Sequence, residues 1–378
     1  MKKLVLAILP VLMLSFIISN QEALSHPEDE PIITSETAIL IDAKSGQVIF
    51  DKDADSKMYP ASITKIITGI IAIEQSDLSD IVQISKEATK VIGTRVYLLE
   101  DEEIELKRLI QGFLINSGND AGTAIAEHIS GSEEAFSKKM NEFIKKKIKV
   151  ENSNFTNPHG LYSDKHYTTA YDMAKIAKYA MKNEVFKEIV GTKEMEWKGE
   201  GWETTIYNHH RLLWDYEGAT GIKNGFVSQA GFTLVTSAER DGRELIAVTL
   251  KAPTSQIAYR DTIRLLEYGF HNFETKIIPK NKMFENTDGE KLQLAADLLV
   301  TVPVNVSIET LIRNDSLVII DEAGNELLEK TLIKLIYYPN QIKVSQDLIL
   351  EDIKEVVEEK EQKTSWFQKL LNFLNIFN

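Results

Sequence analysis

The 378-residue chain contains no cysteine, and this absence excludes several kinds of site at once. Disulfides, thiolate zinc sites, iron–sulfur clusters and cysteine nucleophiles all need that side chain. A basic block is also missing, because 57 Asp and Glu outnumber 43 Lys and Arg and give a net charge of −14. This charge disfavours nucleic acid as a partner, since phosphate backbones are bound by positive surfaces. The 7 histidines show no spacing typical of metal ligands, so we expect no metal and no cofactor.

The N-terminus has the pattern of a secretory signal peptide. Lys2 and Lys3 precede an apolar run, Leu4–Ile18, and small residues follow at Ala23 and Ser25 in the spacing of a cleavage site. The run is short for a membrane span and a polar stretch follows it, although an uncleaved N-terminal anchor remains the alternative. We therefore expect a signal peptide at residues 1–25, cleavage near Ser25 and export of the remaining chain.

Beyond this signal, hydrophobic periodicity predicts an α+β domain over residues 26–275. Alternation with a period of two indicates strands, and a period near 3.6 indicates helices. Strands are expected at 38–50 (a hairpin), 220–226, 231–237 and 244–250, and helices within 63–73, 106–148, 170–181 and 255–269. Strands that open and close the domain around a helical middle favour helices packed on an antiparallel sheet.

The C-terminal part of the chain changes in character. Short β-type runs separated by turns predict a small β-rich domain over residues 276–350. A charged, mostly acidic linker follows at 351–363. Residues 364–378 collect Trp366, Leu370 and other apolar side chains on one helix face, which is typical of an amphipathic helix that lies on a membrane surface.

Ser62-Ile63-Thr64-Lys65 is the first motif that could carry chemistry. A spacing of three residues puts Ser62 and Lys65 on one face of the predicted helix, so the amine can reach the hydroxyl. A serine needs an adjacent base to act as a nucleophile at neutral pH, and a lysine with a lowered pKa can be that base. The alternative is an N-cap serine beside a solvated lysine, but Lys65 lies within an apolar run.

Two further polar motifs lie where a loop and a strand could present them. Ser117-Gly118-Asn119 interrupts the helical stretch, although a simple helix–turn–helix connection would explain this triplet if it stood alone. Lys223-Asn224-Gly225 lies within the predicted strand 220–226, where a lysine is normally just part of a solvated face. Glycine inside a strand indicates the close approach of a ligand or of another backbone.

In this order, the three motifs resemble the S-x-x-K, S-x-N and K-T-G set of penicillin-recognising serine enzymes. The surrounding residues look like those of the low-molecular-weight D-alanyl-D-alanine carboxypeptidases, a group of penicillin-binding proteins. The segments that carry this likeness are Pro60–Lys65, Asn157–Leu161 and Gly221–Phe226. The likeness covers roughly residues 33–275, and it implies that this domain is the catalytic one. A β-rich domain followed by an amphipathic tail also matches the layout of that family.

The resemblance implies a catalytic role for three side chains. Ser62 would attack the carbonyl of the penultimate D-alanine in a peptidoglycan stem peptide. Lys65 would act as the general base. Ser117 would relay a proton to the leaving D-alanine, and Asn119 would hydrogen-bond the peptide amide of the substrate.

The resemblance also implies how the substrate is held. Lys223 would attract the terminal carboxylate, and the strand through Gly225 would pair with the substrate as an added edge strand. The backbone N–H groups of Ser62 and Phe226 would form the oxyanion hole. Arg260, at the start of the closing helix, is a second candidate for the same carboxylate.

One residue departs from the family pattern, because Asn224 stands where the K-T-G motif has threonine. An amide can donate a hydrogen bond to the substrate carboxylate as a hydroxyl does, but the side chain is longer. Catalysis is still expected, whereas the substrate preference and the affinity for β-lactams are left open.

Three functions are compatible with these motifs. The first is an exported carboxypeptidase that trims peptidoglycan at the outer face of the cell membrane and is inhibited covalently by β-lactams. A β-lactamase shares the acylation chemistry, but no E-x-x-L-N segment lies between Ser117 and Lys223. The third is a non-catalytic sensor of β-lactams or stem peptides, which the intact Ser62, Lys65 and Lys223 disfavour. Release of free D-alanine from a pentapeptide would distinguish the first function from the other two.

Overall fold

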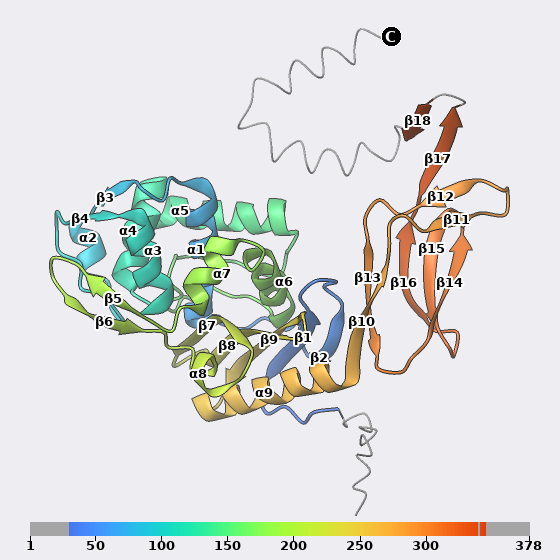
Figure 1. Cartoon of the computed structure of the whole chain (residues 1–378). Helices are drawn as coiled ribbons and strands as arrows, with labels where there is room; N and C mark the ends of the chain where they lie inside the picture. Colours follow the sequence, from blue (N-terminus) through green and yellow to red (C-terminus); the bar gives the residue numbers. More distant parts are fainter. Residues whose placement is uncertain (1–29, 339–340, 345–378) are drawn as a thin grey trace, which may run out of the picture.

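A five-stranded antiparallel sheet organises the larger part of the molecule (Figure 1). The computed structural model describes residues 30–338 and 341–344. The strands follow the order β2-β1-β9-β8-β7, so the first two strands lie beside three that come nearly 170 residues later. Their bounds are β1 (Thr37–Asp42), β2 (Val48–Lys52), β7 (Ala219–Val227), β8 (Gly231–Arg240) and β9 (Arg243–Ala252).

Helices cover both faces of this sheet (Figure 1). α9 (Ser255–Asn272) packs on one face, and α6 (Ala170–Ala180) packs on the other with α1 (Lys65–Gln75) beside it. The strand sequences explain this arrangement, because side chains of a strand alternate between the two faces. In β1, Leu40 joins the apolar cluster under α9, whereas Ile39 joins the core around α1.

The remaining described elements of this region surround α1. The helices are α2 (Lys86–Thr89), α3 (Leu106–Ile115), α4 (Asn119–Ser130), α5 (Glu133–Phe143), α7 (Glu184–Gly191) and α8 (Leu212–Asp215). The short strands are β3 (Ile81–Gln83), β4 (Glu103–Glu105), β5 (Glu194–Lys198) and β6 (Glu203–Tyr207), paired as two hairpin-like sheets. Helices α3, α4, α5 and α7 add a helical layer over the face of the sheet that α6 covers, whereas Leu212 of α8 packs with Ala258 of α9 on the other face (Figure 1).

The predicted arrangement of helices and strands is the one observed, with differences at the ends of elements. A 3₁₀ turn, Ala61–Thr64, precedes α1, so the regular helix begins at Lys65 instead of Ile63. The helical stretch 106–148 is divided into α3, α4 and α5 and ends in a π-helical turn, Ile144–Ile148. The short elements α7, β5 and β6 had no prediction, because segments of 5 to 8 residues carry little periodic signal.

Beyond α9 the described chain consists of strands with a core of their own. β10 (Phe273–Ile278) pairs with β13 (Leu298–Pro303), and β14, β15 and β16 form a three-stranded sheet. The further bounds are β11 (Met283–Glu285), β12 (Lys291–Gln293), β14 (Ile308–Arg313), β15 (Ser316–Asp321), β16 (Glu326–Thr331), β17 (Ile333–Tyr338) and β18 (Gln341–Val344). Val300, Leu317 and Leu292 belong to this separate core. The strands agree with the β-rich character expected here, while the exact domain boundary stays a prediction.

Three predicted segments lie outside the described residues. They are the signal peptide at 1–25, the acidic linker at 351–363 and the amphipathic tail at 364–378. Among the helices within 30–338 and 341–344, none is both long enough and apolar enough to cross a membrane.

One buried carboxylate ties the entrance of the sheet to α9. Asp261 Oδ2 accepts hydrogen bonds from the backbone N–H of Thr34 (2.8 Å) and of Ser35 (2.7 Å), and from Ser35 Oγ (2.9 Å). Its other oxygen, Oδ1, pairs with Arg260 Nη2 at 3.1 Å. Thr34 and Ser35 lie more than 220 residues before Asp261 in the sequence. The Asp261 carboxylate therefore joins the beginning of this region to its last helix.

We predict that Asp261→Ala lowers the free energy of unfolding by about 3 kcal/mol, because buried N–H groups would lose a charged acceptor. Urea denaturation of the purified protein measures this change. Asp55→Ala, which removes an exposed carboxylate, is the control and should change stability by less than about 0.5 kcal/mol. Equal stabilities of the two variants would show that the Asp261 contacts contribute little.

Candidate active site

Lys65 occupies the centre of the predicted site, at the junction of the 3₁₀ turn and α1. Its side chain is fully buried, and Nζ lies 3.4 Å from Ser62 Oγ. The same nitrogen donates to Asn119 Oδ1 and to the carbonyl oxygen of His159, each at 2.7 Å. Three segments distant in sequence therefore meet at one amine.

The electrostatics around Lys65 favour its neutral form. Burial lowers the pKa of Lys65 well below its ordinary value, because a charged ammonium loses its hydration in the interior. The positive charge of Lys223 lowers the pKa further, and the carboxylate of Asp120 opposes both effects. An amine with such a lowered pKa can accept a proton from a neighbouring hydroxyl.

The loop between α3 and α4 carries the second motif, where the sequence predicted a break. Ser117 is buried and has a left-handed backbone, with φ +65°. Asn119 begins α4 and is fixed on both sides of its amide, because Nδ2 donates to the carbonyl of Ile92 (2.7 Å) while Oδ1 accepts from Lys65. A Cβ at Gly93 would lie 2.7 Å from Asn119 Nδ2, so the backbone passes close to this amide.

Lys223 lies in β7, the edge strand of the sheet, and is buried like Lys65. Burial lowers the pKa of Lys223 to about 7. Its Nζ donates to the backbone carbonyl of Asn224 (3.1 Å) and to Asn224 Oδ1 (3.3 Å). The Asn224 side chain thus turns toward the Lys223 ammonium.

Gly225 allows β7 to lie against the 3₁₀ turn that carries Ser62. A Cβ at this position would lie 2.6 Å from the backbone N of Ser62 and 3.1 Å from that of Ile63. Thr233 on the neighbouring strand also donates its hydroxyl to the carbonyl of Pro60, at 2.8 Å. The glycine in this strand therefore has the close backbone approach that the sequence indicated.

The other two predicted binding residues lie in different surroundings. The Phe226 side chain is 53% exposed and its ring packs against Phe232, with centroids 4.5 Å apart. Its expected contribution is the backbone N–H, which the side chain does not affect. Arg260 donates to Thr34 Oγ1 (2.7 Å) and pairs with Asp261, so its guanidinium is engaged at the N-terminal lead-in to the sheet.

Several residues support the site without a signal in the sequence. The Glu133 carboxylate accepts from Thr123 Oγ1 and contacts His159 Nε2, and so fixes the segment whose carbonyl holds Lys65. Asp120, next to Asn119, accepts from the backbone N–H of Val96 at 3.0 Å. These residues become neighbours only through the fold, so single-sequence spacing could not have revealed them.

His209 is a further residue close to the two buried lysines. Burial is the largest cause that lowers the pKa of His209 to about 4, and the positive charges of Lys223 and Lys65 contribute to the same shift. The imidazole is thus neutral at pH 7 and lies close enough to both lysines to feel their charge. Its carbonyl accepts from the Tyr259 hydroxyl at 3.2 Å, which links this loop to α9.

We predict that Gly225→Ala abolishes most acylation by penicillin, by roughly a hundredfold or more, because the new methyl group would push β7 away from Ser62. Stopped-flow acylation rates and thermal melting measure the two effects separately. Gly242→Ala is the control, since this turn glycine has φ +74° and open space around its Cβ position. It should lower stability through backbone strain yet leave acylation within about twofold. Equal acylation rates for both variants would contradict the role given to Gly225.

Comparisons with known proteins agree with this geometry. The family model for D-alanyl-D-alanine carboxypeptidases, peptidase family S11, matches residues 24–254. D-alanyl-D-alanine carboxypeptidase DacF of Bacillus subtilis is 36% identical over 248 residues, which cover 64% of this chain and 63% of that protein. The chain therefore spans just under two thirds of the length of that relative. DacA of Haemophilus influenzae is 32% identical over 293 residues, which cover 72% of this chain and 73% of that protein.

A solved structure gives the same result for the fold. Penicillin binding protein 5 from Haemophilus influenzae superimposes with a TM-score of 0.73 at 28% identity, covering 81% of this chain and 98% of that one. The predicted fold class is thereby confirmed, and the predicted resemblance to the D-alanyl-D-alanine carboxypeptidases is confirmed at the level of the family. Because the family model spans more than half of its residues, the chain belongs to the D-alanyl-D-alanine carboxypeptidase family.

Proposed function

We propose that the protein removes the terminal D-alanine from peptidoglycan stem pentapeptides through an acyl-enzyme at Ser62, and that β-lactams inhibit it by acylating the same serine. The observation that carries this proposal is the set of partners around Lys65. A neutral amine has two N–H donors and one lone pair. Asn119 Oδ1 and the His159 carbonyl, both at 2.7 Å, can take the two donors. The lone pair is then left for the Ser62 hydroxyl, 3.4 Å away.

Acylation follows from this arrangement. Ser62 Oγ attacks the carbonyl carbon of the penultimate D-alanine while its proton moves to Lys65 Nζ. The C–N bond to the terminal D-alanine then breaks, and Ser117 relays the proton from Lys65 to the leaving amine, so that Lys65 becomes neutral again. Water hydrolyses the resulting ester and returns Ser62 to its free form. Burial of Ser117 and Lys65 supports these proton transfers, because bulk water has little access to either side chain.

Substrate recognition is proposed along β7. The strand is an edge of the five-stranded sheet, so its outer backbone groups can pair with an extended stem peptide. The free carboxylate of the substrate would lie against Lys223 and Asn224, and this negative charge would favour protonated Lys223. The close approach at Gly225 supports an oxyanion hole formed by the backbone N–H groups of Ser62 and Phe226. Arg260 remains a candidate only if it leaves its partners Thr34 and Asp261.

We predict that Ser62→Ala abolishes both penicillin labelling and D-alanine release while the protein stays folded. Lys65→Ala should slow acylation by about a thousandfold or more, because nucleophile and base act as a unit. Mass spectrometry of the intact protein detects the adduct, and an enzymatic assay measures free D-alanine. Ser56→Ala, at an exposed position, is the control and should behave as the parent does. Labelling that persists in Ser62→Ala would refute the assignment of the nucleophile.

A second prediction concerns Asn224. Asn224→Ala should slow β-lactam acylation about ten- to a hundredfold, because a hydrogen bond to a charged group contributes roughly 1.5–3 kcal/mol. Asn224→Thr restores the hydroxyl of the family motif and should raise the rate without adding charge. The rates come from stopped-flow measurements on both variants. If both stay within about twofold of the parent, carboxylate recognition belongs to Lys223 without its neighbour.

The location of the protein is part of the same proposal. The substrate lies outside the cytoplasm, which agrees with the signal peptide expected at residues 1–25. The tail, residues 364–378, would lie in the plane of the outer leaflet with its aromatic and leucine face in the lipid. Packing of this tail on the β-rich region is the alternative, which the acidic stretch 351–363 disfavours because it separates the two.

We predict that a chain ending at Lys363 loses most of its binding to membranes, because the apolar helix face is gone. Cosedimentation with bacterial membranes measures the bound fraction, and D-alanine release confirms that the shortened protein is active. A matched full-length variant, Leu370→Ser/Leu374→Ser, should show the same loss with the tail still present. Undiminished membrane binding of both proteins would contradict the proposed anchor.

A further inference from the structure

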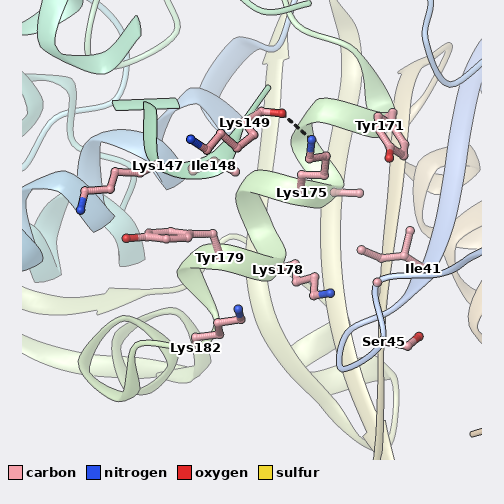
Figure 2. A pocket seen from close by; sticks show the side chains of 12 residues that line it. Ile41, Ser45, Lys147, Ile148, Lys149, Tyr171, Lys175, Lys178, Tyr179 and Lys182 are labelled. Carbon is pink, nitrogen blue, oxygen red and sulfur yellow. Dashed lines mark hydrogen bonds between the residues drawn. The ribbon is translucent and has the colours of Figure 1, made fainter. Parts of the chain in front are cut away.

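Lysines gather around one cleft beside α6, in a chain whose net charge is −14 (Figure 2). The cleft has a volume of about 370 Å³ and contains none of the residues proposed for catalysis. Its positive side chains are Lys147, Lys149, Lys175, Lys178 and Lys182. The turn between β1 and β2 closes one end of the cleft with Ser45 and Gly46.

Two segments distant in sequence bring these lysines together. Lys147 belongs to the π-helical turn after α5, and Lys149 ends that turn with a left-handed backbone at φ +60°. Lys175 and Lys178 are one turn apart on α6, and Lys182 follows the end of that helix. The Lys175 ammonium donates to the carbonyl of Lys149, so this contact joins the two segments (Figure 2).

Among the described residues, the one acidic group that acts on Lys178 is Asp42, whose carboxylate forms no ion pair with it and accepts hydrogen bonds from the backbone N–H groups of Lys44 and Ser45 and from Thr275 Oγ1. Within the described part of the chain, none of Lys147, Lys149, Lys178 and Lys182 forms an ion pair. The neighbouring hollow on α5 differs, because there Lys138 pairs with Glu134 at 2.8 Å and Lys146 with Glu142 at 3.0 Å. Two lysines of that hollow, Lys138 and Lys146, thus have carboxylate partners, whereas these four lysines of the cleft have none among the described residues.

Lys178 lines the cleft, and its side chain is partly buried beneath the turn between β1 and β2. Burial lowers its pKa, and the charge of Lys182 lowers it further, against a raising effect of Asp42. A Cβ at position 46 would collide with Lys178 Nζ, and Gly46 itself has φ +81°. The turn therefore packs directly over the amine, and the cost of crowding like charges would be relieved by a bound anion.

We propose that this cleft binds a phosphate-bearing anion. Lysine ammonium groups bind phosphate as point charges from several directions, which suits a group with charge on three or four oxygens. The volume is sufficient for a phosphate with a small organic part, which could lie against the Tyr171 ring at the edge of the cleft. A free phosphate ester and a lipid headgroup share this chemistry.

The test titrates the full-length protein with inorganic pyrophosphate by calorimetry at physiological ionic strength. We expect saturable binding to the parent, and at least tenfold weaker binding to Lys178→Gln/Lys182→Gln. Lys86→Gln/Lys90→Gln is the matched control, because it removes the same charge from exposed, ion-paired positions at the two ends of α2 and should bind within about twofold of the parent. D-alanine release should be equal in all three proteins, since no changed residue belongs to the proposed catalytic set.

A second arm distinguishes the sources of the phosphate. Vesicles of phosphatidylcholine with and without phosphatidylglycerol are cosedimented with the cleft variant and its control. A loss of phosphatidylglycerol-dependent binding in the cleft variant alone identifies a lipid headgroup, and equal binding of both variants identifies a soluble or polymeric phosphate.

Two outcomes would overturn the proposal. The first is an absence of saturable pyrophosphate binding to the parent. Equal losses of binding in the cleft variant and in its control would have the same consequence, because they would indicate non-specific charge attraction. The second is binding that arises only after Glu358→Gln/Glu359→Gln/Glu361→Gln. That result would assign the cleft to the acidic segment of the chain itself.

Discussion

The burial of Lys65 is the interaction on which the site depends. A lysine cannot be buried without acceptors for its N–H groups, because the desolvation of an unpartnered amine costs several kcal/mol. Asn119 and the His159 carbonyl provide these acceptors from two other segments, which leaves the lone pair of a neutral amine free to face the Ser62 hydroxyl. The same burial lowers the pKa of the amine. The burial that fixes the position of Lys65 is therefore also the main cause of the lowered pKa that the proposed base needs.

In the proposed mechanism, Lys223 would couple substrate recognition to that base. Both lysines are buried, and the charge on Lys223 disfavours a second charge on Lys65. A substrate carboxylate beside Lys223 would offset part of its desolvation. The position of Lys223 depends in turn on Gly225, since any larger residue there would move β7 away from the turn that holds Ser62. The absence of a side chain at Gly225 is thus necessary for the short distance between β7 and the backbone of Ser62.

The sequence predicted the parts of this site that lie in local motifs. Ser62 and Lys65 are three residues apart, and the strand glycine Gly225 already indicated a close backbone approach, which the structure confirms. The order of the sheet was not predictable, because β1 pairs with β9 across some 200 residues and local periodicity carries no information on such pairing. For the same reason His209 and Glu133 escaped notice, since their relation to the lysines exists only in three dimensions.

The central claim is that the pKa of Lys65 lies well below its ordinary value and that the charge of Lys223 contributes to this lowering. NMR titration of protein with ¹³C-labelled lysine side chains measures this directly, with Lys65→Ala used to assign the signal. The account predicts a pKa for Lys65 well below its ordinary value, and a higher pKa in Lys223→Gln, because a nearby positive charge has been removed. A titration near 10.4, the usual value for an exposed lysine, that is unchanged in Lys223→Gln would contradict the account.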